Sequence, residues 1–377
     1  MIRSLNLEQL GARLESVDEL LLILMAHRMA LSLDVGAYKR ATDQPIFRRE
    51  KEGERLLRVQ KLAEKIGLNP NFAAAVLYNI IGESCKQQMI QLQGIYNPPY
   101  DTQDEEEWYQ ILKQNLLQLT ERIAPVYDEQ YGSEFFASRA YRDFENLMLE
   151  QEVDMLNDAE LFVDLGCATG AQTFRLADKF KRSVGYDLSG HMVENASRKL
   201  DHRWLQRVRF QEVDLEDGIP LQNDSASFVM MNLGTASDIW NIRDLIGEAQ
   251  RVLRKGGRFF FSFYNLDALV YQWDFLPWPV NLAAGINNQK SCLDVRVGAE
   301  IFSVYAKPYS VEQAEDFFPA GMKINRRMTY PTVSPLLPNY LFSTERARDA
   351  VLQVDRQLAS SESGAYVIVT GAKEGAA

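Results

Sequence analysis

Hydrophobic residues in the first ninety positions recur at helical spacing. From about residue 5, leucine, valine and methionine side chains return every three or four positions, and no Gly or Pro pair interrupts them before Asp43-Gln44-Pro45. A helix of roughly 35 residues would extend about 50 Å at about 1.5 Å per residue. Such a helix is longer than a small domain needs, so we expect its apolar face to pack against a second chain in a homodimer.

Two shorter helices are predicted next. The second helix runs from about Arg48 to Ile66 and stops at Gly67, a residue favoured just past a helix end. Asn69-Pro70 predicts an N-cap followed by proline in the first turn of a third helix, which ends near Gln93. Residues 1–93 are therefore expected to form an all-helical domain of three helices.

From residue 161 the pattern changes to short β-rich runs that alternate with amphipathic helices. This alternation predicts an α/β domain with a doubly wound, mostly parallel sheet and helices on both faces, so the whole chain is of the α + α/β class. The predicted strands are Leu161–Leu165, Ser183–Asp187, Arg207–Val213, Ser227–Asn232, Arg258–Ser262 and Ala365–Gly371. We expect the last of these strands to close the sheet.

Between these two regions, residues 94–107 contain two prolines, two tyrosines and an acidic run, and we expect a linker there. A further helical stretch, from about Glu106 to Leu156, leads into the second domain, residues 108–377. Residues 266–338 break the strand and helix rhythm and are rich in aromatics and prolines. We expect substrate contacts from that region.

Composition and charge narrow the classes of partner. A formal net charge of -11 argues against a general nucleic-acid binder. Cys85, Cys167 and Cys292 lack CxxC spacing, so we expect no disulfide framework, no metal site and a reduced compartment. The apolar run Leu20–Ala26 is too short to span a bilayer, and the N-terminus lacks the order of a signal peptide, so we expect a cytoplasmic protein without a membrane partner.

A glycine-rich loop, VDLGCATG, follows the first predicted strand. A strand, a glycine loop and a helix place a nucleotide against a helix N-terminus, and glycines let the backbone turn and the ligand approach. The spacing from Gly166 to Gly170 is G-x-x-x-G, whereas sites for a pyrophosphate prefer G-x-G-x-x-G. Asp164 precedes the loop, and an acid suits the sulfonium and amino group of S-adenosylmethionine (SAM) better than a phosphate.

Two further acids follow in order along the predicted sheet. Asp187 ends the second strand, 21 positions after Gly166, where an acid binds ribose hydroxyls, and Asp214 follows the third strand, where it would cap the adenine amino group. With MMNLG after the fourth strand and EAQRVLRKGG before the fifth, the set resembles the class I SAM-dependent methyltransferase family over about residues 108–373. The alternative, that the glycines serve only turns and Asp187 is a solvated strand end, does not explain four matches in order.

The resemblance implies SAM as the cofactor. The residues expected at the cofactor site are Asp164, Gly166, Cys167, Thr169, Gly170, Asp187, Asp214 and Asn232.

Polar residues of the helical region also form a spaced set. Arg28 and Lys39 are eleven residues apart, three turns, on nearly the same face, and Ser84 and Gln88 share a face of the third helix, while Glu52 lies on the second. With LESVDELLLILMAHRMALSLDVGAYKR and GLNPNF, the set resembles the all-helical chorismate mutase family over about residues 7–93. Taken alone, Arg28 and Lys39 would indicate only a solvated basic face.

The mutase reaction explains these residue types. Chorismate rearranges to prephenate within one molecule, so it needs no nucleophile, metal or base, only cations for two carboxylates and donors to the ether oxygen. The resemblance implies that Arg28 binds a carboxylate with support from Ser84. It also implies that Lys39 and Gln88 contact the ether oxygen and that Glu52 binds the ring hydroxyl.

Three positions depart from the family pattern. Gly11 stands where the family has an arginine donated across the dimer, Lys51 replaces the arginine beside Glu52, and Arg48 is a new cation at a polar position. Losing one charge-assisted carboxylate bond typically costs about 2–4 kcal/mol of transition-state stabilisation. The sequence leaves two alternatives open: a mutase of reduced activity, or a non-catalytic module for dimerisation or effector binding.

The methyl acceptor is less defined. His27, His191 and His202 are not expected beside the methyl acceptor, which disfavours a histidine as the catalytic base. The acceptor is then a group that needs no strong base, such as a carboxylate or an acidic carbon, or the base is a Tyr, Asp or Glu. The substrate-binding candidates are Tyr264, Tyr271, Arg296, Arg326 and Arg327, with Trp273, Trp278, Tyr305 and Lys307 beside them.

Because the two domains are fused, we expect the substrate to be a small shikimate-derived acid such as prephenate or phenylpyruvate, by association alone. The alternative is an unrelated small molecule.

Overall fold

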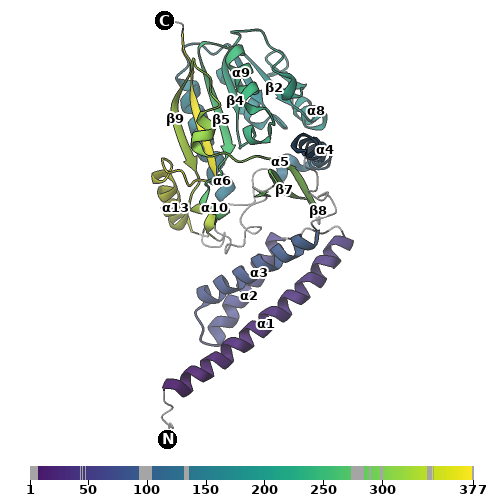
Figure 1. The fold of residues 1–377 in the computed structure, drawn as a ribbon, viewed down its shortest axis with the longest axis vertical. Coiled ribbons are helices and arrows are strands. Elements are labelled where there is room, and N and C mark those ends of the chain that lie inside the picture. The colour runs from purple at the N-terminus through teal and green to yellow at the C-terminus, as the bar shows by residue number, and fades with distance from the viewer. Residues whose placement is uncertain are drawn as a thin grey trace. The chain divides into compact units, whose positions relative to one another are not determined.

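The computed structural model describes residues 7–42, 44, 46, 48–92, 104–130, 136–272, 284–287, 290–297, 300–337, 342 and 344–375 (Figure 1). The chain divides into two compact units. The first unit comprises Met1–Pro98 and Arg296–Ile301, and the second comprises Pro99–Val295 and Phe302–Ala377. The first boundary, between Pro98 and Pro99, falls inside the segment expected to be a linker.

The first unit contains the three expected helices, α1 (Leu7–Ala41), α2 (Arg49–Lys65) and α3 (Pro70–Leu92), and both α1 and α2 pack on α3. Gly67, with φ +75°, ends α2 in a conformation that only glycine adopts without strain. The Asn69 side chain then accepts hydrogen bonds from the backbone of Asn71 (2.9 Å) and Phe72 (3.1 Å), so it caps α3 as its spacing from Pro70 predicts.

The long helix α1 leaves most of its apolar side chains exposed. Only Ser32, Gly36 and Lys39 are buried on it. The exposed large hydrophobic residues of α1 are Leu7, Leu10, Leu14, Val17, Leu20, Leu21, Leu22, Ile23, Leu24, Met25, Leu31, Val35 and Tyr38. A helix with so many apolar side chains uncovered by its own unit presents a surface of the kind that another molecule covers.

By length and composition alone, α1 is also apolar enough to cross a membrane. One 18-residue window of α1 has a mean hydropathy of 1.6 and is 11% buried. The expectation of no membrane segment rested on the shorter run Leu20–Ala26, whereas the whole helix supplies this longer window. Core helices of soluble proteins and signal sequences pass the same test, so the finding is weak evidence for a membrane span.

The second unit is built on a seven-stranded sheet of order β3-β2-β1-β4-β5-β10-β9. Strands β1 to β5 are parallel, and β10 runs antiparallel to both β5 and β9. The strands are β1 (Leu161–Leu165), β2 (Arg182–Asp187), β3 (Val208–Glu212), β4 (Ala226–Met231), β5 (Leu253–Tyr264), β9 (Met322–Tyr330) and β10 (Tyr366–Lys373). The expected α/β domain with a mostly parallel sheet is therefore confirmed.

Strand β9 corrects one detail of the expected sheet. The last strand, β10, does not close the sheet, because β9 pairs with its outer edge, with Met322 opposite Lys373 and Tyr330 opposite Tyr366. The segment MKINRRMTY carries polar or charged residues at alternate positions, and most of these are exposed on an edge strand. The pattern of hydrophobic residues alone did not reveal it.

Helices cover both faces of this sheet, because neighbouring residues of one strand enter opposite cores. In β1, Val163 and Leu165 belong to a core that includes Leu245 and Val252 of α9. Phe162 belongs to the other core, which includes Leu149 of α6. The helices of the unit are α4 (Glu105–Ile123), α5 (Tyr127–Gln130), α6 (Phe136–Asp154), α7 (Ala171–Leu176), α8 (Gly190–Arg198), α9 (Ile242–Val252), α10 (Leu269–Gln272), α12 (Val311–Glu315) and α13 (Glu345–Gln357).

Short 3-10 turns join these elements: η1 (Ala124–Val126), η2 (Ala177–Lys179), η3 (Leu215–Asp217), η4 (Ala236–Asp238) and η5 (Ser334–Leu336). The helical stretch expected from Glu106 to Leu156 is in fact α4, η1, α5 and α6, and the first break falls at Pro125, which has no N–H to continue a helix. Helix α4 begins at Glu105, three residues inside the expected linker.

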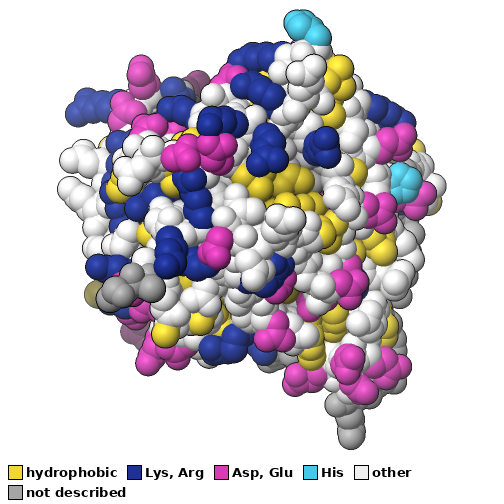
Figure 2. Space-filling model, turned by 90° about the horizontal axis from the view of Figure 1, so that it is seen from above, with side chains coloured by type: hydrophobic (Ala, Val, Ile, Leu, Met, Phe, Trp, Pro, Cys, Tyr) yellow, Lys and Arg dark blue, Asp and Glu magenta, His cyan; other side chains and the backbone are white. Residues whose placement is uncertain are grey.

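Residues 266–338 hold a second, three-stranded sheet that the sequence pattern did not predict. Its strands are β6 (Ala284–Asn287), β7 (Cys292–Val297) and β8 (Glu300–Tyr305), in that order. On the face shown in Figure 2, acidic and basic side chains are interspersed among the coloured residues, and patches of apolar side chains lie between them.

Two candidate active sites

The first site begins at the glycine loop between β1 and α7. Gly166 (φ +75°) and Gly170 (φ +82°) both lie in the left-handed region that favours glycine. A Cβ at Gly166 would lie 2.6 Å from Thr235 Cγ2, and one at Gly170 would lie 2.6 Å from Phe210 Cζ. The loop therefore needs glycine both for its turn and for close packing against the neighbouring strands.

A pocket of about 290 Å³ opens at this loop. It lies beyond the carboxyl ends of the parallel strands, where ligands of such sheets bind. Of the residues expected to hold SAM, Gly166, Asp187 and Asp214 line it, as does the loop residue Ala168. The pocket also takes Tyr109 and Lys113 from α4, which sequence spacing did not indicate.

The Asp187 carboxylate is arranged to bind two hydroxyl groups. Its Oδ2 accepts the backbone N–H of Ala168 (2.8 Å) and its Oδ1 accepts that of Ser189 (2.9 Å). Each carboxylate oxygen has two lone pairs, so each keeps one for a ligand. Burial raises the pKa of Asp187, and these two N–H groups act in the opposite direction. The fixed side chain fits the ribose of the cofactor.

Asp214 and Glu216 form another part of the pocket wall and bind residues of neighbouring elements. Asp214 accepts the backbone N–H of Glu216 (3.1 Å) and pairs with Lys113 (2.5 Å). Glu216 accepts the Tyr109 hydroxyl (3.0 Å) and the Trp240 backbone N–H (2.7 Å). Helix α4 thus contributes Lys113 and Tyr109 to the cofactor pocket, although these residues precede Asp214 and Glu216 by about a hundred positions in the sequence.

The other expected cofactor residues do not line this pocket. Asp164 is buried and its Oδ2 accepts the Thr173 hydroxyl at 2.5 Å, while Thr169 donates to Asp128 (2.6 Å). Cys167 and Asn232 are also buried. Asp164 Oδ1 is a buried acceptor without a hydrogen-bond partner among the described residues. Burial raises the pKa of Asp164 to about 7.

Sequence reasoning missed Asp238, which also lines the pocket. It ends η4, the 3-10 turn that follows β4, and its Oδ1 is buried with no hydrogen-bond partner in the part of the chain that the structure describes. Burial raises the pKa of this carboxyl group. An acid in the loop after the fourth strand, within GTASDIW, is the sequence signal that could have marked it.

The tyrosine candidates lie near the carboxyl end of β5. The ring centroids of Tyr264 and Tyr366 are 5.5 Å apart, and Tyr271 on α10 packs in a small core that includes Tyr366. Burial raises the pKa of both Tyr264 and Tyr271, so both hydroxyls stay protonated at neutral pH. Neither lines the described cofactor pocket, but Tyr305 does, with its ring edge on Tyr109.

Two of the three arginine candidates, Arg326 and Arg327, do not line this pocket. Arg326 donates to Gln151 (2.6 Å) and Arg327 pairs with Glu315 (2.8 Å), because both lie on the edge strand β9. Arg296 belongs to β7, but its side chain lies outside the described residues, as do Trp273 and Trp278 entirely. Lys307 donates its backbone N–H to Ser237 (2.8 Å). His27, His191 and His202 are exposed and do not line the pocket.

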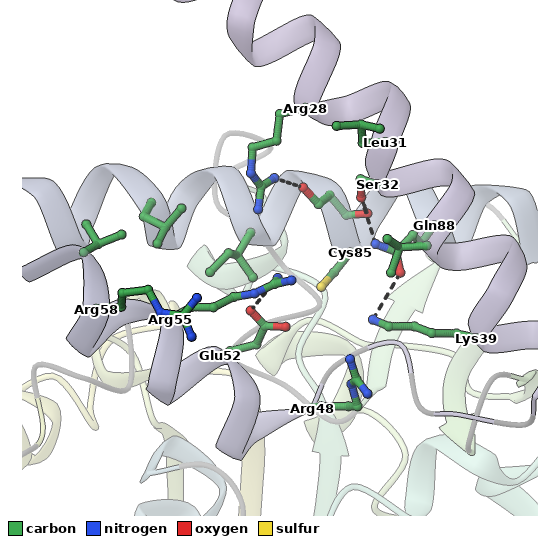
Figure 3. A pocket seen from close by; sticks show the side chains of 15 residues that line it. Arg28, Leu31, Ser32, Lys39, Arg48, Glu52, Arg55, Arg58, Cys85 and Gln88 are labelled. Atoms are coloured by element: carbon green, nitrogen blue, oxygen red, sulfur yellow. Dashed lines mark hydrogen bonds and ion pairs between the residues drawn. The ribbon is translucent and has the colours of Figure 1, made fainter. Parts of the chain in front are cut away.

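The second site is a pocket of about 300 Å³ between the three helices of the first unit (Figure 3). All five residues expected at a mutase site line it: Arg28, Lys39, Glu52, Ser84 and Gln88. Arg28 donates to the Ser84 hydroxyl and to the Ile80 carbonyl, the latter at 3.3 Å. Burial lowers the pKa of Arg28, and the positive charge of Arg55 lowers it further.

Lys39 and Gln88 meet on the opposite side of this pocket. Lys39 Nζ lies 3.4 Å from Gln88 Oε1 and also donates to the Ile46 carbonyl, while Gln88 Nε2 donates to Ser32 (2.8 Å). A Cβ on Gly36 would lie 2.7 Å from Gln88 Cγ. Glycine at this position therefore lets α1 and α3 approach closely enough to bring Lys39 and Gln88 together.

The three departures from the family pattern have clear structural outcomes. Gly11 has open space around it, and among the described residues beyond its own helical turn none lies within 4 Å of a Cβ built there. Lys51 does not line the pocket but pairs with Glu54 (3.1 Å), and its side chain is 56% exposed. Arg48 does line the pocket, and Arg55 and Arg58, which sequence reasoning missed, line it as well.

Comparisons with known proteins match a separate family model to each of the two regions. Residues 10–89 match the family model of chorismate mutase type II, and residues 163–261 match a model described as a methyltransferase domain. The "Probable S-adenosylmethionine-dependent methyltransferase CRG1" of Saccharomyces cerevisiae is 32% identical over 103 residues, which cover 27% of this chain and 35% of that protein.

Two other known proteins are similar at lower identity. The malonyl-(acyl-carrier protein) O-methyltransferase of Nitrosospira multiformis is 26% identical over 175 residues, 42% of this chain and 53% of that protein. A solved SAM-dependent methyltransferase from Clostridium acetobutylicum is 15% identical with a TM-score of 0.42, covering 68% of this chain and 99% of that one. The chain spans about half or less of the length of these curated relatives, and likenesses of this size do not identify a substrate.

The strand order and the glycine loop define a class I methyltransferase fold, preceded by an all-helical domain. By the family models that they match, residues 163–261 belong to a methyltransferase domain and residues 10–89 to a chorismate mutase type II domain. The methyltransferase match and the paired Asp187 contacts support SAM as the cofactor.

Proposed function

We propose that the protein is bifunctional: its helical domain converts chorismate to prephenate, and its α/β domain methylates a small shikimate-derived carboxylic acid. The observation that carries the first half is the common pocket of Arg28, Lys39, Glu52, Ser84 and Gln88. The second half is supported by the presence of this pocket in one chain with the cofactor pocket, which is an argument by association.

In the helical domain the proposed chemistry is binding and electrostatic stabilisation. The Arg28 guanidinium holds a carboxylate of the folded substrate, and Ser84 fixes the guanidinium. The Lys39 ammonium donates to Gln88 Oε1 (3.4 Å) and Gln88 Nε2 donates one N–H to Ser32 (2.8 Å). The ammonium and the second Nε2 N–H then donate to the ether oxygen, which gains negative charge as its C–O bond breaks. No proton is transferred, so the protein supplies orientation and charge only.

In the α/β domain some pocket residues are assigned to the cofactor and one to the methyl acceptor. Bound SAM supplies an electrophilic methyl group on a sulfonium. Asp187 holds the ribose and Asp214 lies at the adenine end, whereas Asp238 is the pocket carboxylate with an oxygen free of partners among the described residues. An acceptor that must lose a proton gives it to Asp238, and its raised pKa makes this carboxylate a stronger base.

The test is incubation of the purified protein with chorismate and SAM, followed by mass spectrometry. We expect prephenate and a product one methyl group heavier than prephenate or a related acid. Chorismate, prephenate and phenylpyruvate are each supplied in turn. Failure of all three to gain a methyl group would refute the proposed substrate class, while chorismate loss alone would still support the mutase half.

We also propose that a second copy of the chain covers the exposed apolar face of α1, giving a cytoplasmic homodimer. The exposed leucines from Leu10 to Leu24 support this, because an uncovered face of this size promotes association. Light scattering after size exclusion should give twice the mass of one chain, and Leu21→Glu should reduce it to one. Recovery of the protein with membranes after cell fractionation would contradict the proposal.

The other candidate for the helical domain is a non-catalytic module that dimerises or binds an effector. Gly11 and the outward Lys51 favour it, since each removes a cation that the family pattern places at the site. The decay of chorismate absorbance with purified protein distinguishes the two candidates. A rate no faster than the uncatalysed one would establish the non-catalytic module.

A further inference from the structure

The charges that line the helical-domain pocket are strongly unbalanced. Five cationic side chains, Arg28, Lys39, Arg48, Arg55 and Arg58, face a single carboxylate, Glu52, among the described residues that line it. Ionised groups of one sign in a partly buried pocket repel each other and stabilise a bound ion of the opposite sign. The pocket is therefore built for an anionic ligand.

Arg55 lies at the Arg28 end of the pocket. Its Nη1 is 3.3 Å from Glu52 Oε2, and in Figure 3 its guanidinium extends over Glu52 toward Arg28. The two arginines are close enough that Arg55 lowers the pKa of Arg28. Two guanidinium groups at one end of a pocket match one carboxylate, whose two oxygens can each accept from both.

Arg48 lies at the Lys39 end. It immediately precedes α2, and its Nη1 donates to Gln44 Oε1 (2.9 Å), which holds the guanidinium in place. Its Nε is buried and has no hydrogen-bond partner among the described residues, so one donor is left for a ligand. Both Arg48 and Arg55 lower the pKa of Lys39, although burial is the larger cause.

Helical spacing explains why these two arginines, and not Lys51, reach the pocket. Glu52 and Arg55 are three residues apart and share one face of α2, and Arg48 is the N-cap residue one turn before Glu52. Lys51 lies about 100° from Glu52 around the helix and pairs with Glu54 on the outside. Two cations that the family pattern places at positions 11 and 51 are absent from the pocket, and Arg48 and Arg55 are present in it.

We propose that Arg48 and Arg55 are substrate-binding residues that complete a dicarboxylate site within one chain, with Arg55 and Arg28 on one carboxylate and Arg48 on the other. This inference rests on the proposed mutase function for the name of the ligand, but not for its charge. A site completed in this way needs no cation from a second chain. The absence of a side chain at Gly11 then carries no penalty.

The experiment measures two quantities on full-length protein: the Kd for prephenate by calorimetry and the steady-state kinetics of chorismate loss. The variants are Arg48→Gln and Arg55→Gln, with Lys61→Gln as the control, an exposed cation of α2 that does not line the pocket. Circular dichroism establishes that each variant folds. Phenylpyruvate, with a single carboxylate, serves as the matched weaker ligand.

We expect each arginine variant to weaken prephenate binding by about ten- to a hundredfold, the usual effect of losing a hydrogen bond to a charged group, and to raise KM more than it lowers kcat. Lys61→Gln should stay within about twofold. Arg48→Gln should also bring prephenate affinity close to that of phenylpyruvate. Gly11→Arg should change the rate little, since the charge it restores is already supplied.

Two results would overturn the inference: arginine variants that bind like Lys61→Gln, or wild-type protein that binds prephenate no better than phenylpyruvate. The proposed function fails separately. If the wild type binds prephenate tightly through Arg48 and Arg55 but does not consume chorismate, the dicarboxylate site stands and the mutase activity does not. If chorismate is consumed and the arginine variants are unaffected, the mutase activity stands and the dicarboxylate site does not.

Discussion

The two pockets of this protein carry opposite charge. The helical-domain pocket places five cations against Glu52, whereas the walls of the cofactor pocket include Asp187, Asp214, Glu216 and Asp238 with Lys113. The first suits a small polyanion, and the second suits a cofactor that carries a sulfonium and an ammonium group. The net charge of -11 describes neither site, so charge has to be examined pocket by pocket.

The pockets also differ in how the chain builds them. Every described wall of the helical-domain pocket comes from three consecutive helices and the turn before α2, so spacing along each helix places its residues. The cofactor pocket joins loops after four strands with α4 and the small second sheet. Sequence spacing is therefore a better guide to the first pocket than to the second.

The largest expected effect comes from removing the Asp187 carboxylate. Asp187→Ala should weaken binding of S-adenosylhomocysteine by about a hundredfold or more, because it removes two charge-assisted acceptors and also releases the Ala168 and Ser189 backbone contacts. Calorimetry measures the Kd. Chorismate turnover should not change in this variant, and a parallel loss of both activities would show that the two pockets are not independent.

Removing Arg28 tests the opposite pocket. Arg28→Ala should lower kcat/KM for chorismate by about a hundredfold, because it deletes a charged contact and frees the Ser84 hydroxyl to move. The decay of chorismate absorbance with time gives the rate. Affinity for S-adenosylhomocysteine is the control, and it should stay at the wild-type value.

Lys39 should give chorismate turnover a characteristic pH dependence. Its ammonium form is the donor, and burial together with Arg48 lowers its pKa, so the rate should fall with rising pH earlier than a free lysine would titrate. In Arg48→Gln one of these causes is removed, and the fall should move to higher pH. The profile is recorded as log kcat/KM against pH. An unchanged profile in this variant would show that the charge of Arg48 does not lower the pKa of Lys39.

Substitution of Gly36 tests close packing rather than charge. Gly36→Ala places a Cβ 2.7 Å from Gln88 Cγ, so Gln88 must shift and its amide leaves the Lys39 ammonium. We expect about a tenfold loss of chorismate turnover with a modest fall in Tm. Gly53→Ala is the matched control, because a Cβ there has open space.

The last prediction concerns how the stability of the methyltransferase unit depends on pH. Glu145 is fully buried, accepts the Tyr141 hydroxyl (2.8 Å) and the Leu233 N–H (2.9 Å), and burial raises its pKa from 4.5 to about 7. The folded protein therefore keeps this proton to higher pH than the unfolded chain. The stability it contributes is present below about pH 4.5 and is lost as pH rises through about 7.

For that group alone the loss amounts to about 3 kcal/mol, at about 1.36 kcal/mol per pKa unit. Glu145→Gln keeps the shape of the side chain and removes the titratable carboxyl group. Unfolding by urea at pH 5 and at pH 8 should show a smaller pH difference for the variant than for the wild type. An equal difference would mean that the Glu145 carboxyl is not the responsible group.

Local structure was largely accessible from the sequence. The ends of the first three helices follow from Gly67 and the cap formed by Asn69 and Pro70, both short-range effects. Strand β1 and its glycine loop lie where the pattern predicts them, because burial on both faces requires a continuous apolar run. The edge strand β9 was missed, since one half-exposed strand carries little hydrophobic signal.

The sequence by itself determined which side chains share a face, because a helix repeats every 3.6 residues and a strand every two. Arg28 and Lys39 were placed together on this ground. Only the tertiary structure decided which face of α2 turns inward, so that Arg55 lines the pocket and Lys51 does not. It also brought Lys113 to Asp214, a hundred residues away. Periodicity is local, whereas the direction of a face depends on the other elements that pack against it.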